Sequence, residues 1–172
     1  MVSRPTQEEE NDLGGVREAP DRSGAYNAED LRGTAAPMRP PMSTHEKVEY
    51  WLEIAVYDLK SAKVMQKGGQ YLHVGFMCQQ VVEKALKAAI AKTGALPPKT
   101  HDLLKLAKIA GLAGYLNEEQ KQLLKDLSPL NVEARYPSYK EAVARSLNKH
   151  ICKEYIIQTE EMLKWIQEKL QQ

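Results

Sequence analysis

The stretch that decides the fold is YLHVGFMCQQVVEKALKAAIAKT, residues 71–93, because its apolar residues recur at helical spacing. These residues are Val74, Met77, Cys78, Val81, Val82, Ala85, Ala88 and Ala89. So wide an apolar face is typical of a helix with neighbours on two sides, and the small alanines allow close approach. Gly94 and Pro97-Pro98 end the pattern, so we expect a helix over residues 71–93.

A second helix is expected immediately before it, from Ser43 to the Gly68-Gly69 pair. Ser43 and Glu46 have the spacing of a capping box, in which each side chain satisfies a backbone N–H of the other residue. The apolar residues that follow at helical spacing are Val48, Trp51, Leu52, Ala55, Leu59 and Ala62. The segment therefore predicts a helix with one apolar side.

Three further helices are expected after Pro98. Thr100 is positioned to cap a short third helix that ends before Gly111, and Asn117 to cap a fourth that ends near Leu127. Residues 129–138 predict an irregular connector, and a long last helix is expected over residues 139–170. With no strand or hairpin signal, the pattern predicts an all-α, antiparallel four- to five-helix bundle.

Residues 1–42 differ from the rest in composition. They contain five prolines, four glycines and no lasting apolar period, and their 5 Arg against 8 Asp and Glu give 5 − 8 = −3. Such a segment cannot bury enough apolar surface to offset its ordering entropy, so we expect a disordered acidic segment at 1–42 and a helical bundle domain at 43–172. Alternatively, Met42 is the true start and the preceding residues belong to an over-extended reading frame.

The composition excludes several classes of protein. The 172 residues carry 24 Lys and Arg against 23 Asp and Glu, a balance unlike that of strongly basic nucleic-acid-binding proteins. We find no apolar run of the roughly 18 residues that a membrane span needs and no secretory signal, so a cytoplasmic location is expected. The two cysteines lie far apart, and no P-loop, GxGxxG or HExxH motif is present, so no cofactor or metal is expected.

Three short segments in series resemble the HEPN family. They are CQQVVEKALKA at 78–88, KTHDL at 99–103 and EARYP at 133–137, and the resemblance covers about residues 44–170. It implies a four- to five-helix bundle, commonly a homodimer. It also implies either nucleotide binding or metal-independent cleavage of RNA, in many members as one half of a toxin–antitoxin pair with a small nucleotidyltransferase.

The catalytic branches of the family carry an Arg-x(4–6)-His motif. Arg145 and His150 match this motif in residue type and spacing. The resemblance implies that the motif lies near the start of the last helix, close to Arg135, so Arg145 and His150 come later than expected. A motif that began at Arg135 would need a His at residues 140–142, and none is present there. On a regular helix, five residues leave two side chains roughly 140° apart, so convergence needs a broken helix or a second subunit. The alternative is that Arg145 pairs with Glu141 and His150 with Glu154, each at i,i+4.

Phosphate-binding candidates come from the helix at 71–93. Gln80, Glu83, Lys84 and Lys87 share one face. Either this face is a polar groove wall where Lys84 and Lys87 attract phosphate, or it is a solvated face with a Glu83–Lys87 pair.

Three more candidates lie outside that helix. His101 either donates to phosphate or caps or packs over its loop. Arg135 and Tyr136 either bind ligand or are structural, in which case Arg135 ties the loop to an acid such as Glu83 and Tyr136 closes the end of the bundle. Two functions remain open: binding of RNA or nucleotide phosphate near Arg135, His101 and Lys84, or a non-catalytic protein–protein interaction module.

Overall fold

The computed structural model describes residues 42–133 and 146–172, and within these it contains helices and no strand. The helices are α1 (Thr44–Lys67), α2 (Tyr71–Lys92), α3 (Leu103–Ile109), the 3-10 helix η3 (Ala113–Tyr115), α4 (Glu118–Leu127), α5 (Leu130–Glu133) and α7 (Lys149–Gln171). Chain contacts divide the molecule into Met1–Pro40 and Pro41–Gln172, and the described residues belong to the second unit. The predicted all-α bundle is confirmed. No described helix has the length and apolar character that crossing a membrane requires.

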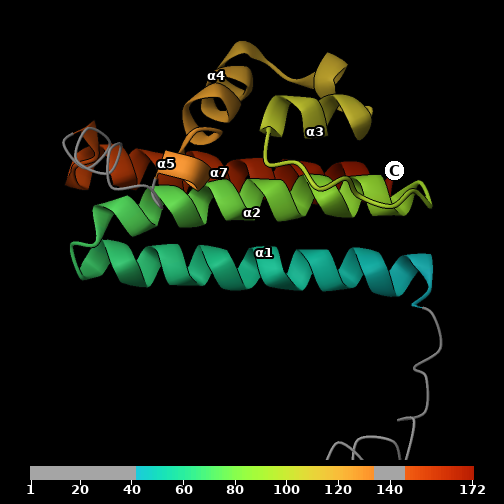
Figure 1. Ribbon diagram of the computed structural model, residues 1–172, viewed down its shortest axis with the longest axis horizontal. Helices are drawn as coiled ribbons and strands as arrows, with labels where there is room; N and C mark the ends of the chain where they lie inside the picture. Colours follow the sequence, from blue (N-terminus) through green and yellow to red (C-terminus); the bar gives the residue numbers. More distant parts are fainter. Residues whose placement is uncertain (1–41, 134–145) are drawn as a thin grey trace, which may run out of the picture. The chain divides into compact units, whose positions relative to one another are not determined.

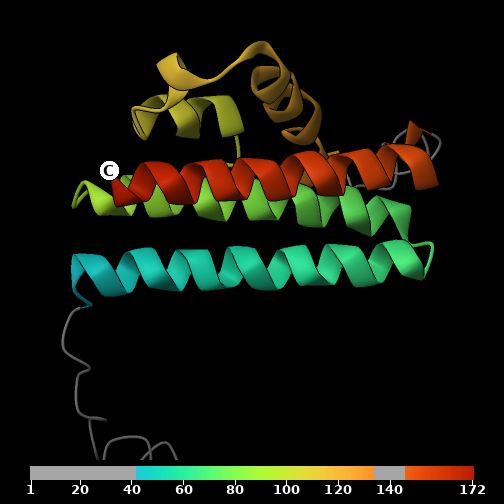
Figure 2. The same ribbon diagram turned by 180° about the vertical axis from the view of Figure 1, so that it is seen from behind.

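Helix α2 is the centre of the bundle, and it packs against α1, α3, α4, α5 and α7. Figures 1 and 2 show α1 and α7 alongside α2, with α3 and α4 on the side of α2 away from α1. Helix α1 runs antiparallel to both. Helices α2 and α7 run in the same direction, because Cys152 contacts Tyr71 near their first residues and Lys92 contacts Leu170 near their last. The chain between them returns to the starting end through α3, α4 and α5.

The core follows from the apolar face expected for residues 71–93. Val81, Val82 and Ala85 are fully buried, and Leu86 and Ile90 are 1% exposed. Burying a large aliphatic side chain stabilises a fold by about 1.5–3 kcal/mol, so this one helix supplies much of the driving force. The buried alanines of α1 and α2 carry only a methyl group, which allows the two helices to lie close together as predicted.

Gly75 of α2 brings two distant leucines to one place. A Cβ built at Gly75 would lie 2.9 Å from Cδ1 of Leu130 and 3.1 Å from Cδ1 of Leu147. Both leucines are buried. Leu130 and Leu147 therefore lie against the same turn of α2.

Two of the predicted caps are confirmed, and one is wrong. Ser43 with Glu46 and Asn117 with Gln120 form complete capping boxes. Helix α3 is capped by Asp102, whose side chain accepts from the backbone N of Lys105, rather than by Thr100. Thr100 instead accepts from the backbone N of Asp102.

The predicted boundaries of the last helix and of the connector before it are also corrected. Leu147 and Asn148 are not helical, and α7 begins at Lys149 rather than running without interruption from residue 139. Asn148 is the N-cap of α7. Its side-chain oxygen accepts from the backbone N of His150 and Ile151, which fixes the start of the helix. The connector expected to be irregular contains the short helix α5.

Candidate functional site

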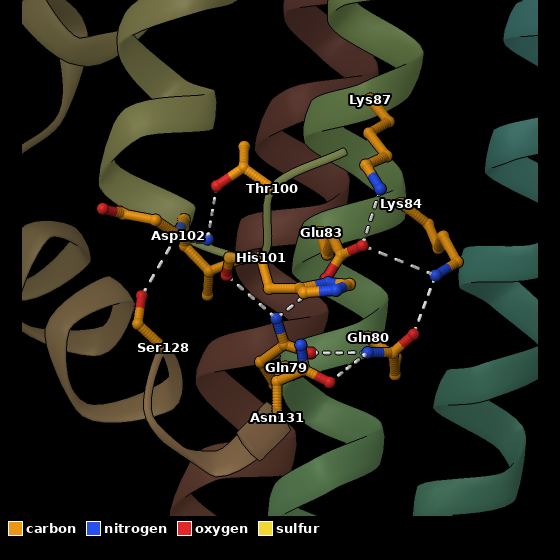
Figure 3. A network of polar contacts seen from close by, with 11 residues as sticks. Gln79, Gln80, Glu83, Lys84, Lys87, Thr100, His101, Asp102, Ser128 and Asn131 are labelled. Atoms are coloured by element: carbon orange, nitrogen blue, oxygen red, sulfur yellow. Dashed lines mark hydrogen bonds and ion pairs between the residues drawn. The ribbon is translucent and has the colours of Figure 1, made fainter. Parts of the chain in front are cut away.

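The site is organised by the carboxylate of Glu83 in the middle of α2, which is 1% exposed. Lys87 Nζ donates to Glu83 Oε1 at 2.7 Å, and the Nδ1 atom of His101 lies 3.0 Å from Glu83 Oε2. Lys84 Nζ lies 3.8 Å from Oε1. Figure 3 shows these three side chains converging on Glu83 from α2 and from the loop before α3. Three basic side chains thus surround one carboxylate.

The environment keeps this carboxylate ionised. Burial alone would raise the pKa of Glu83, because it disfavours the charged form. Hydrogen bonds from Lys87, Gln79 and His101, together with the charge of Lys84, outweigh burial and lower the pKa below its ordinary value. Glu83 is therefore a fixed negative charge at neutral pH.

Helix α1 contributes an aromatic wall and a second carboxylate. The Trp51 ring lies beneath both ammonium groups, with Lys87 Nζ 5.4 Å and Lys84 Nζ 5.9 Å from its centroid. Cations are attracted to the face of an indole ring, so Trp51 helps to hold the two lysines without neutralising them. Burial raises the pKa of Asp58 on α1, and the positive charge of Lys84 opposes that rise.

The loop that carries His101 is fixed to α2 and to the end of α4. Gln79 Nε2 donates to the backbone oxygen of His101 at 3.3 Å and to Glu83 Oε2 at 3.0 Å. The backbone N of Leu103 donates to Ser128 Oγ at 3.2 Å (Figure 3). The imidazole is held through Nδ1, while its side chain remains 53% exposed. Nδ1 facing a carboxylate leaves Nε2 as the ring atom that a ligand would meet.

The structure brings together three of the side chains predicted as ligand contacts, namely Lys84, Lys87 and His101. The expected Glu83–Lys87 pair is present, but the prediction that its face is solvated is wrong, because Lys87 is 8% exposed. We call Gln79, Gln80, Glu83, Lys84, Lys87 and His101 the Glu83 cluster.

Gln79 is a member of this cluster that was not predicted from the sequence. The spacing gave a signal for it, since Gln79, Glu83 and Lys87 stand at i, i+4 and i+8 and so share one side of the helix. Gln79 is fully buried. Its amide therefore links Glu83 to the backbone of the loop.

Three predicted residues, Arg135, Tyr136 and Arg145, lie outside the described residues. Asn131, near the end of the first described range, has its Oδ1 3.4 Å from Nε2 of Gln80 in the Glu83 cluster. Arg135 follows four residues later in the sequence.

His150 stands apart from the Glu83 cluster. It is exposed in the first turn of α7, where Gln66 Nε2 donates to the backbone oxygen of neighbouring Lys149. That end of α7 lies beside Tyr71, about 12 Å along α2 from Gln79. The interruption at Leu147 and Asn148 means that regular helical rotation does not relate residue 145 to residue 150. In the described part of the chain, no ion pair joins His150 to Glu154.

The residues described contain no group of three or more His, Cys, Asp or Glu side chains placed to hold a metal ion. The Glu83 cluster itself offers cations, a fixed carboxylate and an oriented imidazole.

The comparisons with known proteins place the chain in a family. The model of the HEPN domain matches residues 48–170, and the chain belongs to this family. The crystal structure of TT1696 from Thermus thermophilus shares 25% sequence identity with a TM-score of 0.63, over 72% of this chain and 98% of that one.

A second crystal structure, ST0689, is an archaeal HEPN homologue. It shares 24% identity with a TM-score of 0.52, over 72% of this chain and 97% of its own. At this identity the likeness concerns the fold. No curated protein matches the chain.

Proposed function

We propose that this HEPN domain binds a phosphate group of RNA or of a nucleotide at the Glu83 cluster. The observation that carries the proposal is the excess of basic groups, since Lys84, Lys87 and His101 surround a single buried carboxylate. Lys84 and His101 keep exposed surface, with side-chain exposures of 17% and 53%. Phosphate binding by such groups is largely electrostatic, so affinity falls as salt rises.

The same arrangement supports cleavage of RNA without a metal. A carboxylate on Nδ1 orients an imidazole and favours the proton on that nitrogen, which leaves Nε2 to accept or return a proton. In this proposal Glu83 positions His101, His101 acts on the 2′-hydroxyl, and Lys84 stabilises charge on the phosphate. Arg135 and Tyr136 are further proposed ligand contacts, and Arg145 with His150 form the second candidate catalytic pair.

The proposal is tested with labelled single-stranded RNA in EDTA, measuring binding at several salt concentrations and cleavage in parallel. Lys84→Ala should weaken binding several-fold and lower the slope of log K against log salt by about 0.7, the value of one phosphate contact. Lys125→Ala, on the exposed side of α4, removes the same charge elsewhere and should bind as the wild type does.

Cleavage is assigned by two histidine variants. Loss of cleavage in His101→Ala alone supports the Glu83–His101 pair, while loss in His150→Ala alone supports Arg145 and His150. His45→Ala, whose ring lies exposed in the first turn of α1, is the control. Stoichiometric phosphate or RNA binding without cleavage supports a binding domain.

A second function is favoured by a different observation. Each residue of the Glu83 cluster already has a hydrogen-bond partner within the chain, as a structural network would. If the wild type neither binds nor cuts RNA or nucleotides at low salt, a non-catalytic protein–protein interaction module is the better account. For the phosphate-binding function we propose a small nucleotidyltransferase as the partner, and co-purification of the two chains tests it.

A further inference from the structure

The outer face of α1 carries a regular pattern that the bundle does not use. Among the described helices, α1 contacts α2 and α7, and no other described helix lies against its far side in Figures 1 and 2. That face is formed by residues that alternate at steps of four and three: Glu46, Tyr50, Glu53, Tyr57, Lys60, Val64 and Lys67. All seven are exposed. Steps of four and three keep side chains on one side of a helix, as they do along the contact line of a coiled coil.

Apolar side chains on this face are unusually exposed. Tyr50, Tyr57 and Val64 stand one heptad apart and are 50%, 70% and 68% exposed. Beside them lies an open hollow of about 460 Å³, lined by Glu49, Leu52, Glu53, Val56, Tyr57 and Lys60. Exposed aromatic and aliphatic residues in a row mark an interaction surface more often than scattered ones do.

The charges on the same face are ordered along the helix. Glu46 and Glu53 occupy its first half, and Lys60 and Lys67 occupy its second half at the same heptad spacing. A two-fold axis near residues 56 and 57 would place Glu53 opposite Lys60 of a second copy and Glu46 opposite Lys67, each pair occurring twice. The same axis places Tyr50 opposite Val64 within one residue, and the two Tyr57 rings near the axis. Self-complementarity of this kind is what a two-fold interface requires.

We infer that α1 is the contact face of a homodimer, in which the α1 helices of two copies pack antiparallel about residues 56 and 57. We expect the partner on this face to be a second copy of this chain. The acidic first half of α1 lies opposite the basic second half only when two copies of the helix pack antiparallel. A parallel pairing would set Glu53 against Glu53 and Lys60 against Lys60, which is repulsive. This inference does not rest on the proposed phosphate site.

Charge reversal tests the pairing by sedimentation velocity on the full chain. The wild type should reach twice its 19.4 kDa mass as concentration rises, and more readily at low salt. Glu53→Lys and Lys60→Glu should each raise the dimer Kd roughly tenfold, because each reverses two contacts per dimer. The double variant restores opposite charges and should recover most of the affinity. Lys125→Glu on α4 should leave it unchanged.

Engineered cysteines test the direction of the helices under mild oxidation. Tyr57→Cys should give a disulfide-linked dimer, because residue 57 lies near the proposed axis. Val64→Cys should not, since the two copies of residue 64 would lie about 22 Å apart along the helices. Both native cysteines are fully buried. A monomer at every concentration, failure of the double variant to recover, or crosslinking through residue 64 instead of residue 57 would overturn the inference.

Discussion

Glu83 illustrates how one ionised side chain can affect the stability of the domain as well as its site. Its carboxylate is buried against Lys87 at 2.7 Å, so Glu83→Gln would leave that ammonium without its counter-ion. Removing one partner of a buried pair costs about 3–5 kcal/mol. We expect Glu83→Gln to lower the free energy of unfolding by about 3 kcal/mol at pH 7, measured by urea denaturation. Glu168→Gln, exposed on α7, removes the same charge and should have little effect.

The same substitution should change the response to acid. The pKa of Glu83 is lower in the folded chain than its ordinary value of 4.5, so the unfolded chain binds more protons as pH falls through that range. The stabilising contribution is therefore complete above about pH 4.5 and is lost as pH falls through the lower, folded pKa. Wild-type stability should drop more steeply there than that of Glu83→Gln. Parallel curves would contradict the assignment.

At this scale, the sequence predicts which residues share a face but not what covers the face. Helical periodicity placed Glu83, Lys84 and Lys87 together correctly. Their burial depends on Trp51 from α1 and on His101 from the loop before α3, which reach them only through tertiary packing. The buried role of Gln79 depends on the same loop. Local spacing carries no information about such neighbours.

At the scale of single elements, the start of α7 depends on one cap. Asn148 Oδ1 accepts from the backbone N of His150 at 2.9 Å and of Ile151 at 3.0 Å. Replacing an Asn cap with Ala costs typically about 1 kcal/mol, so Asn148→Ala should lower the free energy of unfolding by that amount. Asn148→Asp keeps the acceptor and adds negative charge at the positive end of the helix, so it should match the wild type or exceed it. Equal stability of Asn148→Ala and the wild type would show that the cap contributes nothing.

The end signals of the helices explain which boundaries could be predicted. Ser43 and Asn117 each precede a Glu or Gln three residues later, a pattern specific enough to fix a helix start. Around Asn148, apolar residues continue at helical spacing on both sides, through Val143, Leu147 and Ile151. Periodicity therefore predicted one continuous helix across Asn148, where the cap in fact begins α7. The resemblance to the HEPN family supplied the fold correctly, while the spacing of Arg145 and His150 could not locate them in space.

For the molecule as a whole, the core contains two cysteines from helices that are far apart in sequence. Cys78 of α2 and Cys152 of α7 are both fully buried and belong to one cluster of apolar side chains. Burial raises the pKa of Cys78 to about 12 and that of Cys152 to about 11. Only thiolates react quickly, so at about pH 8 both thiols should be protected by burial and by protonation together.

Thiol labelling therefore reports how the bundle opens. We expect both cysteines of the native chain to react with a maleimide slowly and at one common rate, and both to react at once in denaturant. A single rate follows because α2 packs against all the other described α-helices, so its core cannot open without the bundle. Leu96→Cys, 87% exposed between α2 and α3, is the control and should react quickly in the native state. Fast reaction of Cys152 with Cys78 still protected would show instead that α7 separates from α2 by itself, and would contradict a core that opens as one unit.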